Sequence, residues 1–266
     1  MKTHHLTFFV GFAALFLLYH AAEYMIIFHN SITGFLLFQA VFFIAAYTIA
    51  RLQVDKGFAA YGLSWNAIVP KHLLIGALCG VMLYGAAWLL NIKLGIEKVT
   101  HVPSTLVIIK DSLPFVLGVF LSSLSEDIFT RGYIYCHLNG KQRKSVIVLV
   151  SASIYVLNHI YKIGKGPEAW LYLFFLGVLF CIPLVYTGRL WFTTALHWAG
   201  NALFYVSHQV ITTDDSDAFI SANYLFCFVI VSATATMLIY WKVVPVLQRS
   251  CLGKSFNQKS MHEHLS

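Results

Sequence analysis

Apolar stretches, each about as long as a helix that crosses a bilayer, follow one another along most of this 266-residue chain. Such a helix needs roughly 20 consecutive, mostly apolar residues. Only 11% of the residues are charged, whereas charged residues make up about a quarter of an average soluble domain. A chain with so few charges cannot cover a surface that faces water, and the sequence therefore predicts a polytopic membrane protein.

The predicted fold is all-α, a polytopic transmembrane helical bundle of about eight spans. A helix satisfies its own backbone hydrogen bonds in lipid, and the alternating pattern of a membrane β-barrel is absent from the sequence. The predicted spans cover residues 6–28, 31–51, 72–92, 113–138, 145–161, 169–187, 190–210 and 218–241.

The basic residues in the loops predict an orientation. If the N-terminus is cytoplasmic, most basic residues fall in cytoplasmic segments, among them Arg51, Lys71, Arg143 and Lys242. An excess of Lys and Arg is typical of cytoplasmic loops. We therefore expect an integral, multi-pass protein of the plasma membrane, or of the inner membrane in a bacterium, with both termini in the cytoplasm.

Charge and cysteine content argue against nucleic-acid binding, against a disulfide framework and against a structural zinc site. The net charge of +7 comes from basic residues scattered through short loops, without the aromatic-basic patch that binds nucleic acid. The five cysteines are an odd number and form no C-x-x-C pair, so we expect neither a disulfide framework nor a structural zinc site. The expected partners are the lipid bilayer and a peptide or protein at the membrane.

Three ionisable residues stand close together in the predicted span at 113–138. Each such residue costs about 2.5–3.5 kcal/mol at mid-bilayer on insertion scales, and such residues are functional by default. Asp127 and Arg131 are four residues apart, lie on one helix face and can pair. Glu126 points about 100° away from Asp127 and has no obvious partner. The structural alternative is an ion pair with a stray carboxylate near a helix end.

Two later spans carry further polar pairs. His159 follows Tyr155 by four residues, and His197 precedes Asn201 by four, so each pair shares a helix face. Taken singly, a histidine in an apolar run is more often a satisfied core group, and a His-Asn pair is often hydrogen-bonding glue between helices. Together with Glu126 they fit hydrolysis, in which a carboxylate beside an imidazole activates water and paired donors stabilise an oxyanion.

The order of these motifs resembles that of the CPBP family of intramembrane proteases, named for CaaX proteases and bacteriocin-processing enzymes. The chain reads E-D-I-F-T-R at 126–131, Y-V-L-N-H at 155–159 and H-W-A-G-N at 197–201. The family pattern is E-E-x-x-x-R, then F-x-x-x-H, then H-x-x-x-N. The chain departs from it at Asp127, which replaces the second Glu, and at Tyr155, which replaces Phe.

The resemblance implies a glutamic-type endopeptidase in which Glu126 activates water with the help of His159. It implies that His197 and Asn201 stabilise the oxyanion, and that Arg131 is structural. The protease domain would cover residues 1–245, with its motif core at 113–210 and a polar cytoplasmic tail at 246–266. The substrate would be membrane-associated or lipidated, with a prenylated C-terminus, a leader peptide or a sorting tail as the cleaved segment.

Asp127, Arg131 and Tyr155 are expected to support the site rather than to react. Asp127 is one methylene shorter than the family's Glu, which leaves its reach toward Arg131 or the water open. Tyr155 keeps the aromatic body of Phe and adds a hydroxyl.

The glutamate mechanism requires no cofactor. Glu126, His159 and His197 also make up a His₂Glu set of the kind that binds catalytic zinc. However, the H-E-x-x-H motif is absent, and Asn201 is a poor zinc ligand. We therefore favour a site without a metal and keep a divalent metal as the alternative.

Two functions from other classes stay open. A transporter would use the polar cluster to bind an ion or a proton. A non-catalytic immunity or maturation partner would retain the cavity only for recognition, and the replacement at Asp127 is the feature that favours it.

Two smaller patterns lead to structural expectations. Gly76, Gly80 and Gly85 form a small-residue face that begins with G-x-x-x-G, a pattern that allows helices to pack closely. His20 and Glu23 lie three residues apart in the first span, and we expect Glu23 to extend to the membrane interface.

Overall fold

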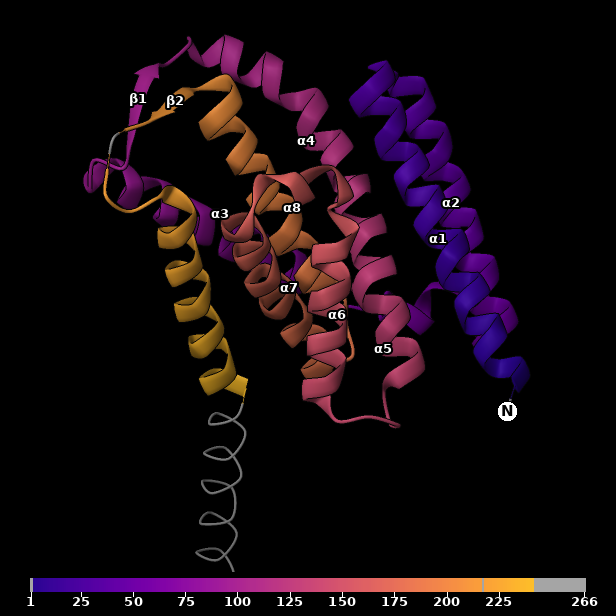
Figure 1. Ribbon diagram of the computed structural model, residues 1–266. Coiled ribbons are helices and arrows are strands. Elements are labelled where there is room, and N and C mark those ends of the chain that lie inside the picture. Colours follow the sequence, from indigo (N-terminus) through magenta and orange to yellow (C-terminus); the bar gives the residue numbers. More distant parts are fainter. Residues whose placement is uncertain (1, 217, 242–266) are drawn as a thin grey trace, which may run out of the picture.

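The computed structural model describes residues 2–216 and 218–241 and is almost entirely helical (Figure 1). The α-helices are α1 (Lys2–His29), α2 (Ile32–Val54), α3 (Val69–Lys93), α4 (Thr105–Asp127), α5 (Tyr133–Leu138), α6 (Lys144–Asn158), α7 (Pro167–Thr187), α8 (Trp191–Tyr205) and a further helix, Ala222–Trp241. Short 3₁₀ turns cover Gly57–Tyr61 and Ile160–Lys165, and π-helical turns cover Ile128–Gly132 and Val206–Val210. The predicted all-α membrane bundle is confirmed, while the predicted tail at 246–266 lies outside the described residues.

Within residues 2–216 and 218–241, six helices are long and apolar enough to cross a membrane. They are Leu6–His29, Ile32–Val54, Val69–Lys93, Thr105–Leu138, Pro167–Thr187 and Ala222–Trp241. The other two predicted spans, 145–161 and 190–210, correspond to α6, which has 15 residues, and to α8 with the π-helical turn Val206–Val210 that directly continues it. A helix of 15 residues is about 22 Å long, so α6 covers only part of a hydrocarbon core of roughly 30 Å.

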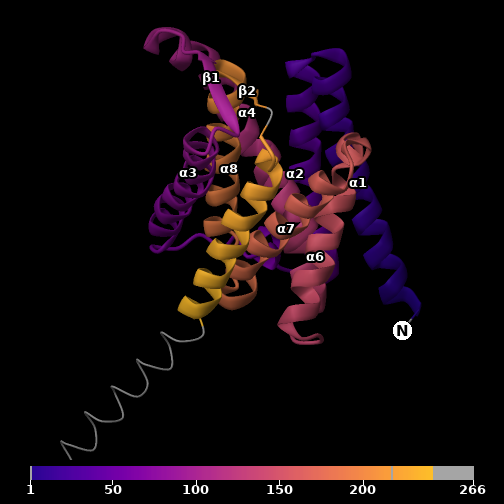
Figure 2. The same cartoon turned by 60° about the vertical axis from the view of Figure 1, so that its left-hand side comes forward.

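α8 lies at the centre of the bundle. It packs along α3 and also contacts α4 and α7. α6 packs along α7, and α1 and α2 form an antiparallel pair at one side (Figure 1; Figure 2). Since α4, α6 and α8 carry the three sequence motifs, this arrangement brings the motifs toward one interior region.

A small antiparallel ribbon, which the sequence analysis did not predict, joins two loops at one end of the bundle (Figure 1). Strand β1 (Glu97–His101) follows α3, and strand β2 (Thr212–Asp215) follows the π-helical turn after α8. Glu97 stands opposite Asp215 in the register. The ribbon therefore ties the ends of α3 and α8 together.

The start of α1 and the end of helix Ala222–Trp241 lie at the same end of the bundle in both views (Figure 1; Figure 2). This placement agrees with an even number of crossings between them. The cytoplasmic orientation of that end stays a prediction.

The glycine face of α3 packs against α8. A Cβ on Gly76 would collide with the backbone carbonyl oxygen of Phe192, and a Cβ on Gly80 would collide with that of Leu196. The packing role predicted from the G-x-x-x-G pattern is therefore confirmed at these two positions. This close approach fixes the helix that carries His197.

Candidate active site

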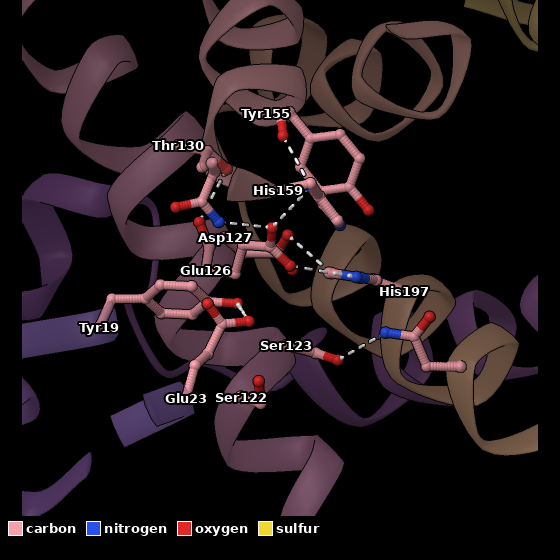
Figure 3. Close-up of polar contacts among 12 residues, drawn as sticks. Tyr19, Glu23, Ser122, Ser123, Glu126, Asp127, Thr130, Tyr155, His159 and His197 are labelled. Atoms are coloured by element: carbon pink, nitrogen blue, oxygen red, sulfur yellow. Dashed lines mark hydrogen bonds and ion pairs between the residues drawn. The ribbon is translucent and has the colours of Figure 1, made fainter. Parts of the chain in front are cut away.

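Glu126 and Asp127 are the last two residues of α4, and both are buried inside the bundle (Figure 3). The next five residues, Ile128–Gly132, form a π-helical turn before α5 continues the same long helix. Such turns are rare and occur frequently at functional sites. The side chains of Ile128 and Phe129 are fully buried, so the turn directly after the two acids packs into the hydrophobic core.

Asp127 pairs with Arg131, as the spacing of four residues predicts, and both side chains are fully buried. Arg131 Nη1 donates to Asp127 Oδ1 and also lies 3.1 Å from Thr130 Oγ1. The guanidinium carbon lies 4.5 Å from the ring centre of Tyr155 and 5.0 Å from that of Phe180. The carboxylate and the two ring faces together stabilise a cation that has no access to water. The missing methylene of Asp127 does not prevent the pairing.

His197 lies between the two acids (Figure 3). Its Nδ1 is 3.1 Å from Asp127 Oδ1, and its Nε2 is 3.6 Å from Glu126 Oε2. Since an ionised carboxylate only accepts hydrogen bonds, Nδ1 carries a hydrogen and donates it to Asp127. Nε2 then faces the Glu126 carboxylate.

The end of α6 supplies two side chains to Glu126. Asn158 Nδ2 donates to Glu126 Oε1 over 2.8 Å, and His159 Nδ1 lies 3.8 Å from the same oxygen. Neighbouring residues on a continuous α-helix point about 100° apart. α6 ends at Asn158, and His159 leaves the helical conformation with φ −82° and ψ 50°. The break in the helix is the reason that both side chains reach one carboxylate.

Asn158 is the site residue that the sequence analysis missed. It is only 2% exposed, and its 2.8 Å contact is shorter than those of His159 and His197 to the Glu126 carboxylate. The motif Y-V-L-N-H contains it, and a polar residue in an apolar run was a usable signal. Helical spacing alone turns it away from His159, which is why it was passed over.

Tyr155 supports His159 through its backbone and its ring. Its carbonyl oxygen lies 2.7 Å from His159 Nδ1, and the two rings meet edge to face with centres 4.6 Å apart. A carbonyl oxygen only accepts, so this contact places a hydrogen on Nδ1. The aromatic body that Tyr155 shares with Phe is therefore the part that contacts Arg131 and His159.

Asn201 lies one helical turn beyond His197 on α8, as predicted, but its contact is with another part of α4. Its Nδ2 is 3.5 Å from Ser123 Oγ. Ser123 is one turn before Asp127, so Asn201 borders the cluster rather than joining it. Six of the seven predicted site residues thus gather around the two acids, namely Glu126, Asp127, Arg131, Tyr155, His159 and His197.

A second polar group lies on α1 near the same turn of α4 (Figure 3). His20 Nδ1 is 2.9 Å from Glu23 Oε2, and the Tyr19 hydroxyl donates to Glu23 Oε1 over 3.3 Å. The Glu23 side chain is 25% exposed and turns toward these two partners, and its extension to the membrane interface stays a prediction. Pairing within α1 costs less than carrying an unpaired carboxylate into lipid.

No group of three or more His, Cys, Asp or Glu side chains in the described part of the chain has a geometry that could hold a metal ion. The four cysteines at described positions are free. The arrangement instead gathers a carboxylate, two imidazoles and an amide around one point. These are the groups that move protons and hold a charged intermediate during hydrolysis.

A comparison with protein families bears on this cluster. Residues 109–203 match the model of the family described as Rce1-like, Type II CAAX prenyl endopeptidase Rce1-like. The chain carries a domain of this protease family. The matched residues include all three motifs, so the resemblance stated from the sequence is confirmed. A domain of this family implies an intramembrane protease. No curated protein matches the chain.

Proposed function

We propose that this protein is an intramembrane endopeptidase in which Glu126 is the general base. The observation that supports this proposal is the arrangement of three polar side chains around the Glu126 carboxylate. Asn158 holds Oε1, His159 lies on the same side, and His197 faces Oε2. A buried carboxylate with one oxygen fixed by an amide and the other beside an imidazole is positioned to accept a proton from water.

The proposed reaction follows from these contacts. Glu126 takes a proton from water, and the oxygen of that water bonds to the carbonyl carbon of the peptide. Asn201 donates to the oxyanion of the tetrahedral intermediate, and so does His197 from Nε2, which must carry a hydrogen in this step besides the one on Nδ1. The carbon–nitrogen bond then breaks, and Glu126 returns the proton to the leaving amine. His159 orients the water and the carboxylate.

Asp127 and Arg131 act through His197 rather than on the substrate. Asp127 Oδ1 receives the hydrogen of His197 Nδ1 and is itself paired with Arg131. This pairing fixes the ring so that Nε2 points toward Glu126. The shorter acid in place of the family's Glu retains both contacts, and this supports a catalytic protein over a relic that only recognises peptides.

The substrate we propose is a membrane-associated or lipidated peptide, cleaved without a metal and without another cofactor. The family consists of metal-independent glutamyl proteases and is described by its prenylated substrates, which makes a prenylated C-terminus the first class to test. Both termini of the chain are proposed to be cytoplasmic, since the basic loops fall on that side.

The test is a cleavage assay with the full chain in proteoliposomes. Wild type and the Glu126→Gln variant would receive a panel of farnesylated C-terminal peptides, leader peptides and sorting tails, with products identified by mass spectrometry. We expect cleavage by wild type only, unchanged by a chelator. Cleavage that a chelator abolishes would assign a metal to the site.

The two rival functions predict other outcomes of the same test. A transporter leaves every peptide whole, and Glu126→Gln then stops ion or proton flux into the vesicles. A recognition protein binds a peptide without cleaving it, equally well in wild type and in Glu126→Gln. Either result would overturn the proposed protease.

A further inference from the structure

A second hollow lies beyond the catalytic cluster, where the ends of α3 and α8 meet the start of α7 and helix Ala222–Trp241. Its volume is about 730 Å³, and it is lined by Tyr84, Asn91, Glu97, Glu168, Phe204 and their neighbours. Sites for small organic groups commonly measure about 300–1,000 Å³. The hollow is therefore far larger than a bare ion requires.

Buried polar atoms in this lining have no hydrogen-bond partner within the described residues. They are Glu97 Oε2, Asn91 Oδ1 and Trp88 Nε1. Glu97 is 6% exposed and Asn91 is 5% exposed. A buried polar group without a partner costs about 1–3 kcal/mol. The two oxygens can accept hydrogen bonds from a bound ligand, and the indole N–H of Trp88 can donate one to it.

The charge of the lining indicates which kind of ligand would donate to the unpartnered oxygens. Glu97, Glu168 and Asp215 line the hollow together with one lysine, Lys165. His208 Nε2 lies 3.4 Å from Glu97 Oε1, the other oxygen of that carboxylate, so Oε2 stays unpartnered among the described residues. The excess of carboxylates favours a cation.

Aromatic side chains in the lining favour an organic cation over a metal ion. Tyr84, Tyr172, Phe204 and Phe226 contribute rings beside the carboxylates. Ring faces attract ammonium and guanidinium groups. A peptide that carries a basic side chain also brings backbone carbonyls, which can accept from Trp88 Nε1. A basic peptide thus matches all three unpartnered atoms.

The hollow is joined to the catalytic region through α3 and α8. The ring of Tyr84 packs on Gly200 of α8. Phe204 of α8 lines the hollow together with Ser207 and His208 of the π-helical turn that continues α8. Ten residues separate His197 from Ser207, which corresponds to about 15 Å along a helix. An extended peptide covers that distance in about four to five residues.

We propose that this hollow is a specificity subsite, which binds a lysine or arginine side chain about four to five residues from the cleaved bond. Glu97 and Glu168 pair with the cation, and Asn91 Oδ1 accepts a further hydrogen bond from it. This inference rests on the proposed protease function, because it assigns the cation to the peptide substrate.

The first experiment measures binding without cleavage. The full-length Glu126→Gln variant, in phosphatidylcholine vesicles, would be titrated with two fluorescent peptides that differ only by lysine or norleucine at one position. We expect the lysine peptide to bind about tenfold more tightly, the ratio that one hydrogen bond to a charged group supplies. Adding Glu97→Gln removes this preference, and adding Asn91→Asp increases it.

The matched control is Asp55→Asn. Asp55 is an exposed acid at the opposite end of the bundle, where it pairs with Arg51. This change must leave the lysine preference intact. Misfolding of the Glu97→Gln variant could also abolish the lysine preference. The expected increase in preference for Asn91→Asp cannot arise from misfolding, so the two variants together decide the outcome. A preference that survives Glu97→Gln, or that Asn91→Asp does not increase, would overturn the proposal.

Two competitors identify other occupants. If phosphatidylethanolamine vesicles abolish the preference, the hollow binds a lipid amine instead. If millimolar Ca²⁺ displaces the lysine peptide and Mg²⁺ does not, it binds a metal ion. Either result overturns the peptide subsite.

The second experiment uses cleavage by wild type and separates the two proposals. The lysine is moved along the best substrate from the peptide panel, and rates are compared with those of Glu97→Gln. We expect a rate maximum about four to five residues from the cut, absent in the variant. If the cleavage rate does not depend on the position of the lysine, the proposed subsite is overturned and the proposed protease function stands. If the protein binds the lysine peptide selectively but cleaves no peptide, the proposed protease function is overturned, while cation binding by the hollow still stands.

Discussion

Two polar regions lie along α8, and they differ in how their acids are partnered. In the catalytic cluster, the Glu126 carboxylate is surrounded by Asn158, His159 and His197. In the hollow beyond it, the Glu97 carboxylate has His208 at 3.4 Å, while its second oxygen is buried without a partner among the described residues. The first region supplies its own donors, whereas the second requires them from a ligand.

This difference separates a site for chemistry from a site for binding. A preorganised cluster keeps its groups in one geometry before the substrate arrives, so that little reorganisation occurs during the reaction. A hollow with unpartnered oxygens gains its missing hydrogen bonds only when it is occupied. Substitutions in the first region should therefore change the rate or the fold, and those in the second should change the choice of substrate.

Glu126→Gln should have the largest effect, and it tests whether the cluster catalyses peptide cleavage. The amide keeps the size of the side chain and can still accept from Asn158 Nδ2, but it cannot take a proton from water. We expect the rate to fall by about 10²–10⁴-fold, the usual contribution of a general base. The measurement is the initial rate of peptide cleavage in proteoliposomes, with Asp55→Asn as the control. A variant with more than a tenth of wild-type activity would contradict the assignment.

Arg131→Met should cause the largest loss of stability. It removes a fully buried cation and leaves the buried Asp127 carboxylate without its ion-pair partner, with the His197 imidazole as its remaining donor among the described residues. Breaking such a pair costs about 3–5 kcal/mol. The matched control is Arg51→Met, which breaks an exposed ion pair worth about 0–1 kcal/mol. Thermal unfolding of both variants in detergent is the measurement.

A double variant sharpens this result. Asp127→Leu combined with Arg131→Met removes both charges and should restore much of the stability, although not the activity, since His197 loses its partner. If the double variant is as unstable as Arg131→Met alone, then the loss comes from packing on Tyr155 and Phe180 rather than from the unpaired charge.

Asn158→Leu tests the residue that sequence reasoning passed over. The change removes the donor to Glu126 Oε1 and keeps the number and branching of the side-chain heavy atoms, although leucine is the bulkier residue. A hydrogen bond to a charged group contributes about 1.5–3 kcal/mol, so we expect kcat to fall by roughly ten- to a hundredfold with KM little changed. A shifted pH profile distinguishes a positioning role from a structural one. An unchanged kcat would remove Asn158 from the site.

The sequence was informative wherever one segment determines the outcome. The spans predicted at 6–28, 31–51 and 72–92 appear as Leu6–His29, Ile32–Val54 and Val69–Lys93, because long apolar runs leave few alternatives in lipid. Asp127 and Arg131 pair as predicted because both lie within one turn of the same helix. The motifs also indicated which acids and histidines gather.

What the sequence did not reveal depends on helix ends and on contacts between distant segments. Asn158 reaches Glu126 only because α6 ends there, and no periodicity marks that end. Asn201 contacts Ser123 through the packing of α8 on α4. The hollow brings together Asn91, Glu97 and Glu168, which no spacing rule connects, through a β-ribbon whose two strands lie more than 100 residues apart.

Gly80→Ala should have the smallest effect of these, and it tests whether the two regions depend on one helix interface. A Cβ at Gly80 would collide with the Leu196 carbonyl oxygen, beside His197, so α8 must shift at the catalytic end. Overpacking of this kind costs about 1–3 kcal/mol, and we expect a lower unfolding temperature together with slower cleavage. The matched control is Gly85→Ala, whose Cβ would lie at an ordinary 3.4 Å from Leu203 Cδ2, nearer the hollow. If Gly85→Ala slows cleavage as much as Gly80→Ala does, α3 and α8 move as one unit, and the two regions are not independent.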